Sequence, residues 1–128
     1  MSKLLLTDEL AEQFVACLLT IVRSDDRIDP VESVALHRVI ADTLGGANVD
    51  FAKAMFMHVT LDSFAKAIKA SGGSPYRGSS ISPPEAIGKA FIEAAVQVAD
   101  SGDGLTAKEV TKINRYARAL GVKPVKIG

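Results

Sequence analysis

The stretch FVACLLTIVRSDDRIDPVE, from Phe14 to Glu32, returns later in the chain as FIEAAVQVADSGDGLTAKE, from Phe91 to Glu109. The two stretches align without a gap at a constant offset of 77, the difference between 91 and 14. Each copy combines an apolar helical stripe, an acidic turn and the start of a second helix, which predicts two helical hairpins related by internal repetition. The matched pairs are Phe14 and Phe91, Ser24 and Ser101, Asp26 and Asp103, Ile28 and Leu105, Glu32 and Glu109, and Arg38 and Arg115.

Apolar residues recur with helical spacing along most of the chain, and no segment alternates as a β-strand would. In the first copy Leu10, Phe14 and Ile21 fall on one helical face, and Phe91 and Val98 do so in the second. The pattern predicts an all-α fold, a bundle of about six helices built from two pseudo-symmetric helical hairpins. The expected boundaries are a start after Thr7, an end at Gly45 and Gly46, a break near Thr60 to Asp62, and an end at Gly121.

The length of 128 residues suits a single domain that spans residues 1–128. Within this domain the repeat units cover about residues 8–45 and 84–121. The segment between the units ends in SGGSPYRGSSISPP, residues 71–84, whose Gly and Pro content predicts an exposed loop without regular structure.

This loop contains two features of its own. Tyr76 and Arg77 stand among small residues. They could form an exposed binding site for a partner, or they could belong to a loop that only connects the two units. At the end of the loop, Ser82 to Glu85 has the pattern of a helix N-cap followed by proline and an acidic third residue.

Charge and composition narrow the classes of function. Lys plus Arg is 15 and Asp plus Glu is 15, so the chain has no overall positive charge that would favour nucleic acid. Its longest apolar runs reach about half of the roughly 20 residues that span a bilayer, so we expect no membrane insertion. The N-terminus has no pattern of a secretory signal, which predicts a cytoplasmic protein. The single cysteine, Cys17, is expected to be a buried small hydrophobe.

No motif for catalysis is present. His37 and His58 lack a neighbouring nucleophile and orienting carboxylate, and we expect both to be surface residues. The sequence also lacks a nucleophile elbow, a phosphate-binding GxxxxGK loop and a dinucleotide fingerprint. We therefore expect a protein that is not an enzyme.

Helix capping explains part of the acidic turns. In the first turn Asp29 is placed as an N-cap, Pro30 as the first helical residue, and Glu32 as the third residue that bonds back to the cap. In the second turn Thr106 and Glu109 have the pattern of a capping box. These residues therefore have a structural interpretation that needs no ligand.

Capping does not explain Asp25, Asp26, Asp100 and Asp103, because each helix start needs only one cap. Their mutual repulsion could be relieved by a shared calcium or magnesium ion, if the two turns lie close together. The alternative is two solvated acidic turns that never meet. No cofactor is assigned beyond this divalent cation. The candidate metal ligands are Asp25, Asp26, Asp29, Glu32, Asp100, Asp103 and Glu109.

A calcium-binding EF-hand is excluded by the register of the turns. Aligning Glu32 and Glu109 with the last ligand of that loop puts Ile21 and Val98 at its first ligand position, and neither can ligate through its side chain. Any cation site must therefore have another geometry.

SDDRIDPVE and its echo GDGLTAKE resemble the repeated unit of the TerB family of tellurite-resistance proteins and of the related domain in membrane-tethered DnaJ-like co-chaperones. The resemblance spans about Leu10 to Leu120, and it departs from the family pattern at Asp26 and Asp103, which stand at the usual glycine position. It implies an all-α fold with pseudo-twofold halves, an acidic surface, divalent-cation binding and a role in bacterial stress-response complexes near the membrane.

Two functions follow as expectations. The first is a non-enzymatic interaction module in bacterial tellurite or stress resistance, which binds protein partners, including a membrane-associated stress complex, and whose binding could depend on a cation. The alternative is a small divalent-cation-binding protein that uses its two acidic interhelical turns. A homodimer is left open.

Overall fold

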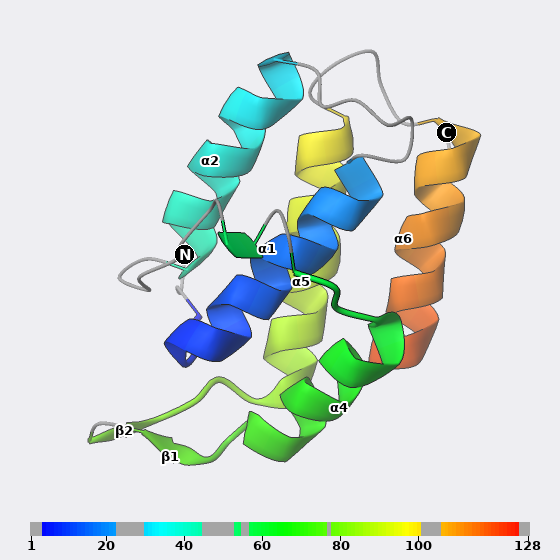
Figure 1. The fold of residues 1–128 in the computed structure, drawn as a ribbon. Coiled ribbons are helices and arrows are strands. Elements are labelled where there is room, and N and C mark those ends of the chain that lie inside the picture. The colour runs from blue at the N-terminus through cyan, green and yellow to red at the C-terminus, as the bar shows by residue number, and fades with distance from the viewer. Residues whose placement is uncertain are drawn as a thin grey trace.

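The computed structural model of the chain describes residues 4–22, 30–44, 53–54, 57–76, 78–100 and 106–125 (Figure 1). Five helices and two very short strands are found in these ranges. Lys53 and Ala54 are also helical, but their neighbours lie outside the described residues, so a sixth helix stays a prediction. The elements are α1 (Asp8–Val22), α2 (Pro30–Leu44), α4 (Leu61–Ser71), β1 (Pro75–Tyr76), β2 (Ser79–Ser80), α5 (Pro84–Ala99) and α6 (Ala107–Leu120).

Local capping sets several of the helix boundaries, as the sequence predicts. The Thr7 hydroxyl accepts a hydrogen bond from the Leu10 N–H at 3.1 Å, at the start of α1. Thr60 caps α4 in the same way, which confirms the predicted break. Gly121 ends α6 with a φ of 73°, a left-handed conformation in which glycine carries no penalty from a Cβ atom.

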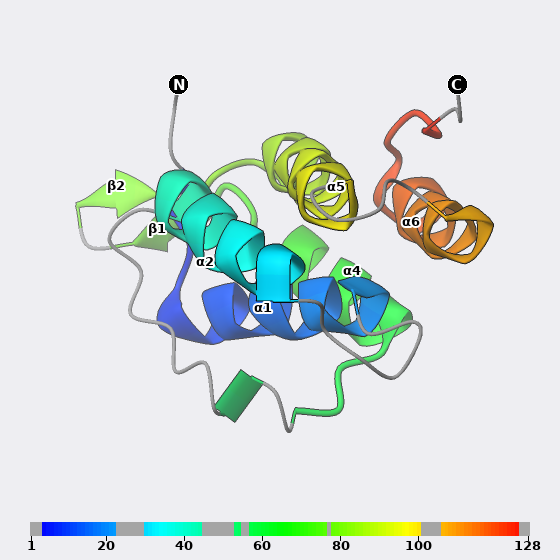
Figure 2. The same cartoon turned by 90° about the horizontal axis from the view of Figure 1, so that it is seen from above.

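The five described helices form two layers (Figure 2). α2, α5 and α6 lie side by side in one layer, and α1 and α4 form the other. α5 lies in the middle of its layer and contacts each of the other four. α6 lies at one edge of its layer, so that part of its circumference faces no other described helix.

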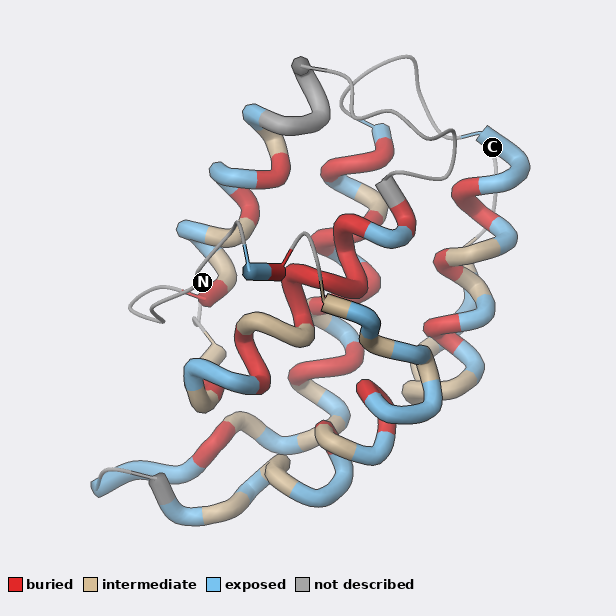
Figure 3. Tube along the Cα trace, in the orientation of Figure 1, coloured by how far each residue is buried: buried red, intermediate tan, exposed pale blue. Residues whose placement is uncertain are grey.

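An aromatic cluster fills the space between the layers. The Phe14 and Phe91 ring centroids are 5.1 Å apart and nearly perpendicular. Phe64 from α4 and Tyr116 from α6 each lie with their ring centroid 5.1 Å from that of Phe91. The three phenylalanines are fully buried, and Figure 3 shows that buried positions occupy the inner sides of the helices. An edge-to-face pair such as Phe14 and Phe91 adds about 0.5–1.5 kcal/mol beyond the burial of its area.

Residues separated by the repeat offset of 77 contact each other, both inside the repeat units and just before them. Phe14 and Phe91 form the ring pair described above. Leu5 and Ser82, also 77 residues apart, bond to each other twice, because the Leu5 N–H donates to the Ser82 hydroxyl and the Ser82 N–H donates to the Leu5 carbonyl. Contacts between equivalent residues are typical of elements related by a twofold axis.

The second helices of the two units are placed differently. α2 packs mainly on α5, the first helix of the other unit, and only slightly on α1. α6 also packs mainly on α5, which belongs to its own unit. The fold is thus mostly helical, as expected, whereas the pseudo-symmetry of whole hairpins stays a prediction.

The predicted loop 71–84 departs from expectation. β1 and β2 pair in antiparallel register, with Pro75 opposite Ser80, so the prediction of no regular structure is wrong. The same residue types that suggested a loop make the hairpin possible. Gly78 supplies a φ of 81° in the turn, and Pro75 sits at the start of a strand. The hairpin projects from the end of the helical body (Figure 1).

The expected cap at the end of this segment is also wrong. Pro83 is the N-cap of α5 and makes no side-chain hydrogen bond. The Ser82 hydroxyl instead accepts the hydrogen bond from the Leu5 N–H at 2.9 Å, which ties the N-terminal segment to the hairpin. A contact distant in sequence therefore competes for the group that local sequence assigns to a cap.

The aromatic cluster yields a first prediction. Phe91→Ala should lower the free energy of unfolding by about 3–5 kcal/mol, because it removes a fully buried ring and leaves a cavity. Urea unfolding followed by circular dichroism measures this loss. Val34→Ala is the control, because Val34 is 60% exposed on α2, and its effect should stay within about 0.5 kcal/mol. Similar small losses in both variants would contradict the central place of Phe91.

Candidate functional site

The described residues next to the two predicted acidic turns lie at one end of the helical body. The C-terminal ends of α1 and α5 and the N-terminal ends of α2 and α6 all point toward the upper end in Figure 1, which we call the turn pole. Lys112 on α6 supports this proximity, because its ammonium group donates to the Thr20 carbonyl in the last turns of α1 at 3.4 Å. Both repeat units therefore contribute to the same pole.

Most of the predicted metal ligands lie outside the described residues. Asp25, Asp26, Asp29 and Asp103 lie outside the described residues. Glu32 lies in α2, but its side chain is outside the described part of the chain. Across the described ranges, no group of three or more His, Cys, Asp or Glu side chains is arranged to hold a metal ion. The cation site that combines the two turns therefore stays a prediction.

Glu109 takes part in the predicted capping box of α6, whose N-cap is Thr106. Its carboxylate accepts a hydrogen bond from the Thr106 N–H, and its own N–H donates to the Thr106 hydroxyl, both at 3.1 Å. The residue is only 4% exposed, although it is a carboxylate. The reciprocal bonds satisfy two N–H groups of the helix start and explain why an acid is buried there. The structural interpretation of Glu109 is confirmed.

Asp100, in contrast, is an exposed carboxylate at an unfavourable position of its helix. It is exposed at the C-terminal end of α5, where its N–H donates to the Val96 carbonyl at 2.9 Å. A carboxylate at this end of a helix faces the negative end of the helix dipole, which is unfavourable by about 0.3–1 kcal/mol. The last turn of α5 has no basic residue to compensate. The position of Asp100 is therefore not explained by the stability of its own helix.

A feature that the sequence analysis missed lies on α6. Its outer surface carries Lys108, Lys112, Arg115 and Arg118, which we call the α6 basic face. These residues follow helical spacing, so the periodicity used for apolar residues would have found them if it had been applied to charge. Because the formal net charge of the chain is zero, the overall composition did not indicate this local excess of positive charge.

Two groups that could act as nucleophile or base, Cys17 and Tyr116, are buried in the core. Cys17 is fully buried, and burial raises the pKa of its thiol to about 12, against a lowering by its hydrogen bond with Tyr116. Burial also raises the pKa of Tyr116. The thiol therefore stays protonated near neutral pH and is a poor nucleophile. His37 and His58 are exposed, as expected.

Comparisons with known protein families, with curated proteins and with solved structures gave no match. Within the described residues, no helix combines the length and the hydropathy that crossing a membrane requires.

The capping box of α6 allows the structural and the metal interpretations of Glu109 to be separated. Thr106→Ala should lower the free energy of unfolding by about 1 kcal/mol, because one helix N–H loses its side-chain partner. Since the cap needs no ion, this decrease in the free energy of unfolding should be the same with a chelator and with saturating calcium or magnesium. Urea unfolding measures the decrease under both conditions.

Thr111→Ala is a matched control on the same helix. The Thr111 hydroxyl bonds only to the Ala107 carbonyl one turn earlier, and the residue is exposed, so its removal should be neutral or slightly stabilising. A loss for Thr106→Ala that changes when the cation is added would show that the cap and an ion share Glu109.

Proposed function

We propose that this chain is a non-enzymatic interaction module of the TerB type, which acts in bacterial tellurite or stress resistance by binding protein partners. The proposal rests on the repeated SDDRIDPVE and GDGLTAKE units and on their resemblance to that family. It includes the finer architecture of six helices in two pseudo-symmetric hairpins. Partners in the proposal include a membrane-associated stress complex, and the site of action is the cytoplasm.

The single observation that supports this function best is the turn pole itself. The helix ends next to both predicted acidic turns point to one end of the body (Figure 1). Because these helix ends lie together, the two repeat units can present one composite surface, larger than that of either unit alone. Loops and turns on a rigid helical scaffold are also where binding residues are most often found.

The alternative, a small divalent-cation-binding protein, is favoured by Asp100. An exposed carboxylate at a helix C-terminus is disfavoured by the helix dipole, and a bound calcium or magnesium ion would offset that cost. In this alternative Asp25, Asp26, Asp29 and Asp103 supply further oxygen ligands. Glu109 is a poor ligand, because its carboxylate already bonds to the Thr106 N–H.

Site-specific photo-crosslinking tests the interaction module. A benzoylphenylalanine replaces Gln97, an exposed residue near the end of α5 at the turn pole, and cells of the native host are irradiated with and without tellurite. The matched control carries the same residue at Glu85, which is exposed at the opposite end of the same helix. We expect a stress-dependent protein adduct at Gln97 and none at Glu85.

The same experiment separates the two functions. An adduct at Gln97 that survives a permeant chelator supports an interaction module that needs no cation. An adduct that the chelator abolishes, and that Asp100→Asn weakens, supports a cation-dependent module. Absence of any adduct at Gln97, or equal adducts at both ends of α5, would contradict the proposal that the turn pole binds proteins.

A further inference from the structure

The outer surface of α6 is uniformly cationic. Lys108, Lys112, Arg115 and Arg118 are all exposed or half-exposed. The one acidic residue of the helix, Glu109, is buried in the capping box and does not offset them. The face therefore presents four positive charges and no carboxylate, in a chain whose formal net charge is zero.

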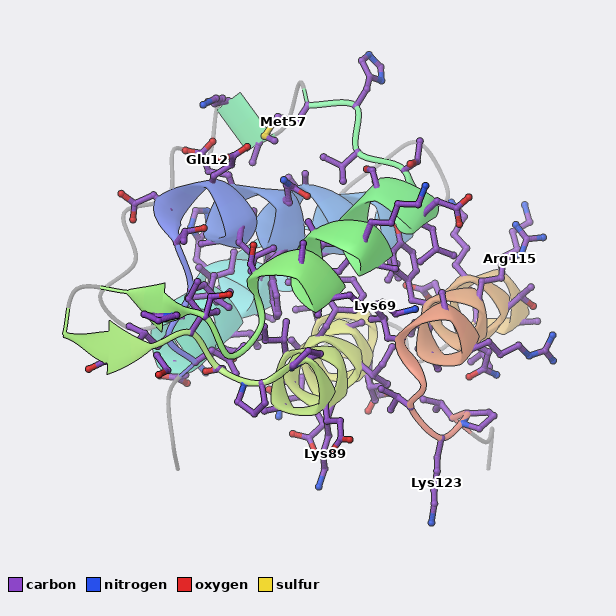
Figure 4. All side chains as sticks on the ribbon, turned by 90° about the horizontal axis from the view of Figure 1, so that it is seen from below. Glu12, Met57, Lys69, Lys89, Arg115 and Lys123 are labelled. Carbon is purple, nitrogen blue, oxygen red and sulfur yellow. The ribbon has the colours of Figure 1, made fainter. Side chains whose placement is uncertain are left out.

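These cations have no anionic partner in the described residues. No described carboxylate lies within ion-pair distance of any of the four. Lys112 donates to the Thr20 carbonyl, which is a neutral group. In Figure 4 Arg115 points away from the helical body. The remaining cations are thus available to a binding partner.

Repulsion among the four cations destabilises α6. Lys108 and Lys112 are one turn apart, and so are Lys112 and Arg115, and Arg115 and Arg118. Like charges at such spacing destabilise a helix by a few tenths of a kcal/mol per pair. An anionic partner would offset this repulsion, because its negative charges would attract the four cations. The row extends over roughly 15 Å, since an α-helix rises 1.5 Å per residue.

The surface between the cations is shaped to admit an anionic group. Ala107 and Thr111 are small, and together with Lys108, Lys112 and Arg115 they line a shallow hollow of about 320 Å³. Small residues beneath longer cationic side chains let a carboxylate approach the ammonium and guanidinium groups without a steric clash. Arg can then bind it through two parallel hydrogen bonds.

The chemistry of the face distinguishes between classes of anionic partner. Single-stranded nucleic acid is usually bound by aromatic residues that stack on bases, but Tyr116, the aromatic residue of α6, is buried. A helix that binds a lipid surface stably usually combines its cations with apolar residues that enter the lipid, yet the large exposed hydrophobic residues of the described chain, Leu5 and Val34, lie on other segments. Binding to a row of carboxylates on a polypeptide needs neither exposed aromatic residues nor exposed apolar residues on the α6 basic face.

We propose that the α6 basic face docks an acidic segment of a partner protein. The proposal deepens the interaction module and rests on it, since it names the chemistry of one partner surface. A partner helix with glutamates one turn apart matches the spacing of the cations, as in the charged flanks of paired helices. Because the contact is electrostatic and exposed, its affinity falls steeply as salt is added.

Fluorescence anisotropy with a labelled oligoglutamate peptide tests the docking face in purified protein. The variant Lys108→Gln, Arg115→Gln, Arg118→Gln removes three charges and leaves Lys112, which bonds to Thr20, in place. At low salt we expect it to bind about tenfold more weakly than the wild type, because exposed charge pairs contribute modestly but add up. Oligoglutamine of the same length should not bind.

The control removes the same charge elsewhere. Lys66→Gln, Lys69→Gln and Lys89→Gln change exposed residues of α4 and α5, two of which are labelled in Figure 4, and should alter the affinity less than twofold. Equal weakening by both triple variants would show attraction to net charge alone and overturn the proposal. Failure of the wild type to bind oligoglutamate at low salt would also overturn it.

Two further arms test the other partners. Tighter binding to phosphatidylglycerol vesicles, or to single-stranded RNA, than to oligoglutamate would contradict the assignment to an acidic polypeptide. Far-UV circular dichroism and thermal unfolding confirm that the variants are folded. Binding of oligoglutamate is measured in purified protein, whereas the Gln97 adduct is measured in cells. If oligoglutamate does not bind but the Gln97 adduct forms, only the α6 basic face is rejected as a docking site, and the interaction module is not.

Discussion

The contact between the Phe14 and Phe91 rings is the constraint on which the rest of the structure depends. It joins the first helices of the two repeat units at equivalent positions, with the ring centroids 5.1 Å apart. Phe64 and Tyr116 close around Phe91, so α4 and α6 are held by the same cluster. A ring that three others contact cannot change in size without disturbing four helices, because protein cores pack as densely as organic crystals.

The surface features follow from this packing. With α1 and α5 joined through their phenylalanines, the helix ends next to both predicted acidic turns point to one pole, and α6 comes to lie at the edge of its layer. The buried polar groups of this region are satisfied internally, Glu109 by the cap and Cys17 by Tyr116. Asp100 and the α6 basic face remain outside. Asp100 is not explained by the stability of its helix, and neither are Lys108 and Arg115, whereas Arg118 in the last turn of α6 is favoured by the helix dipole. Both are therefore the best places to look for a binding role.

Local chemistry made the helices predictable. Thr7, Thr60, the capping box of Thr106 and Glu109, and Gly121 act on their own neighbours in sequence, so their effects can be derived without a fold. The hairpin could not be derived in this way. Its strands are two residues long, and it is supported by the bonds of Ser82 with Leu5, a partner far away in the chain.

Packing partners and surface charge were harder to predict. An apolar stripe shows which side of α2 is buried, but it does not show that α2 packs on α5 rather than on α1. The repeat predicts acidic turns between helices, whereas the common pole of the neighbouring helix ends depends on tertiary structure. The α6 basic face was missed because the total charge averages over the whole chain.

The most direct test of the central contact is a nuclear Overhauser experiment on protein with selectively labelled phenylalanine. If the first helices meet as described, strong cross-peaks connect the ring protons of Phe14 with those of Phe91, and the Phe91 ring also connects to Phe64. A spectrum of the folded protein in which Phe14 and Phe91 share no cross-peak would contradict the account.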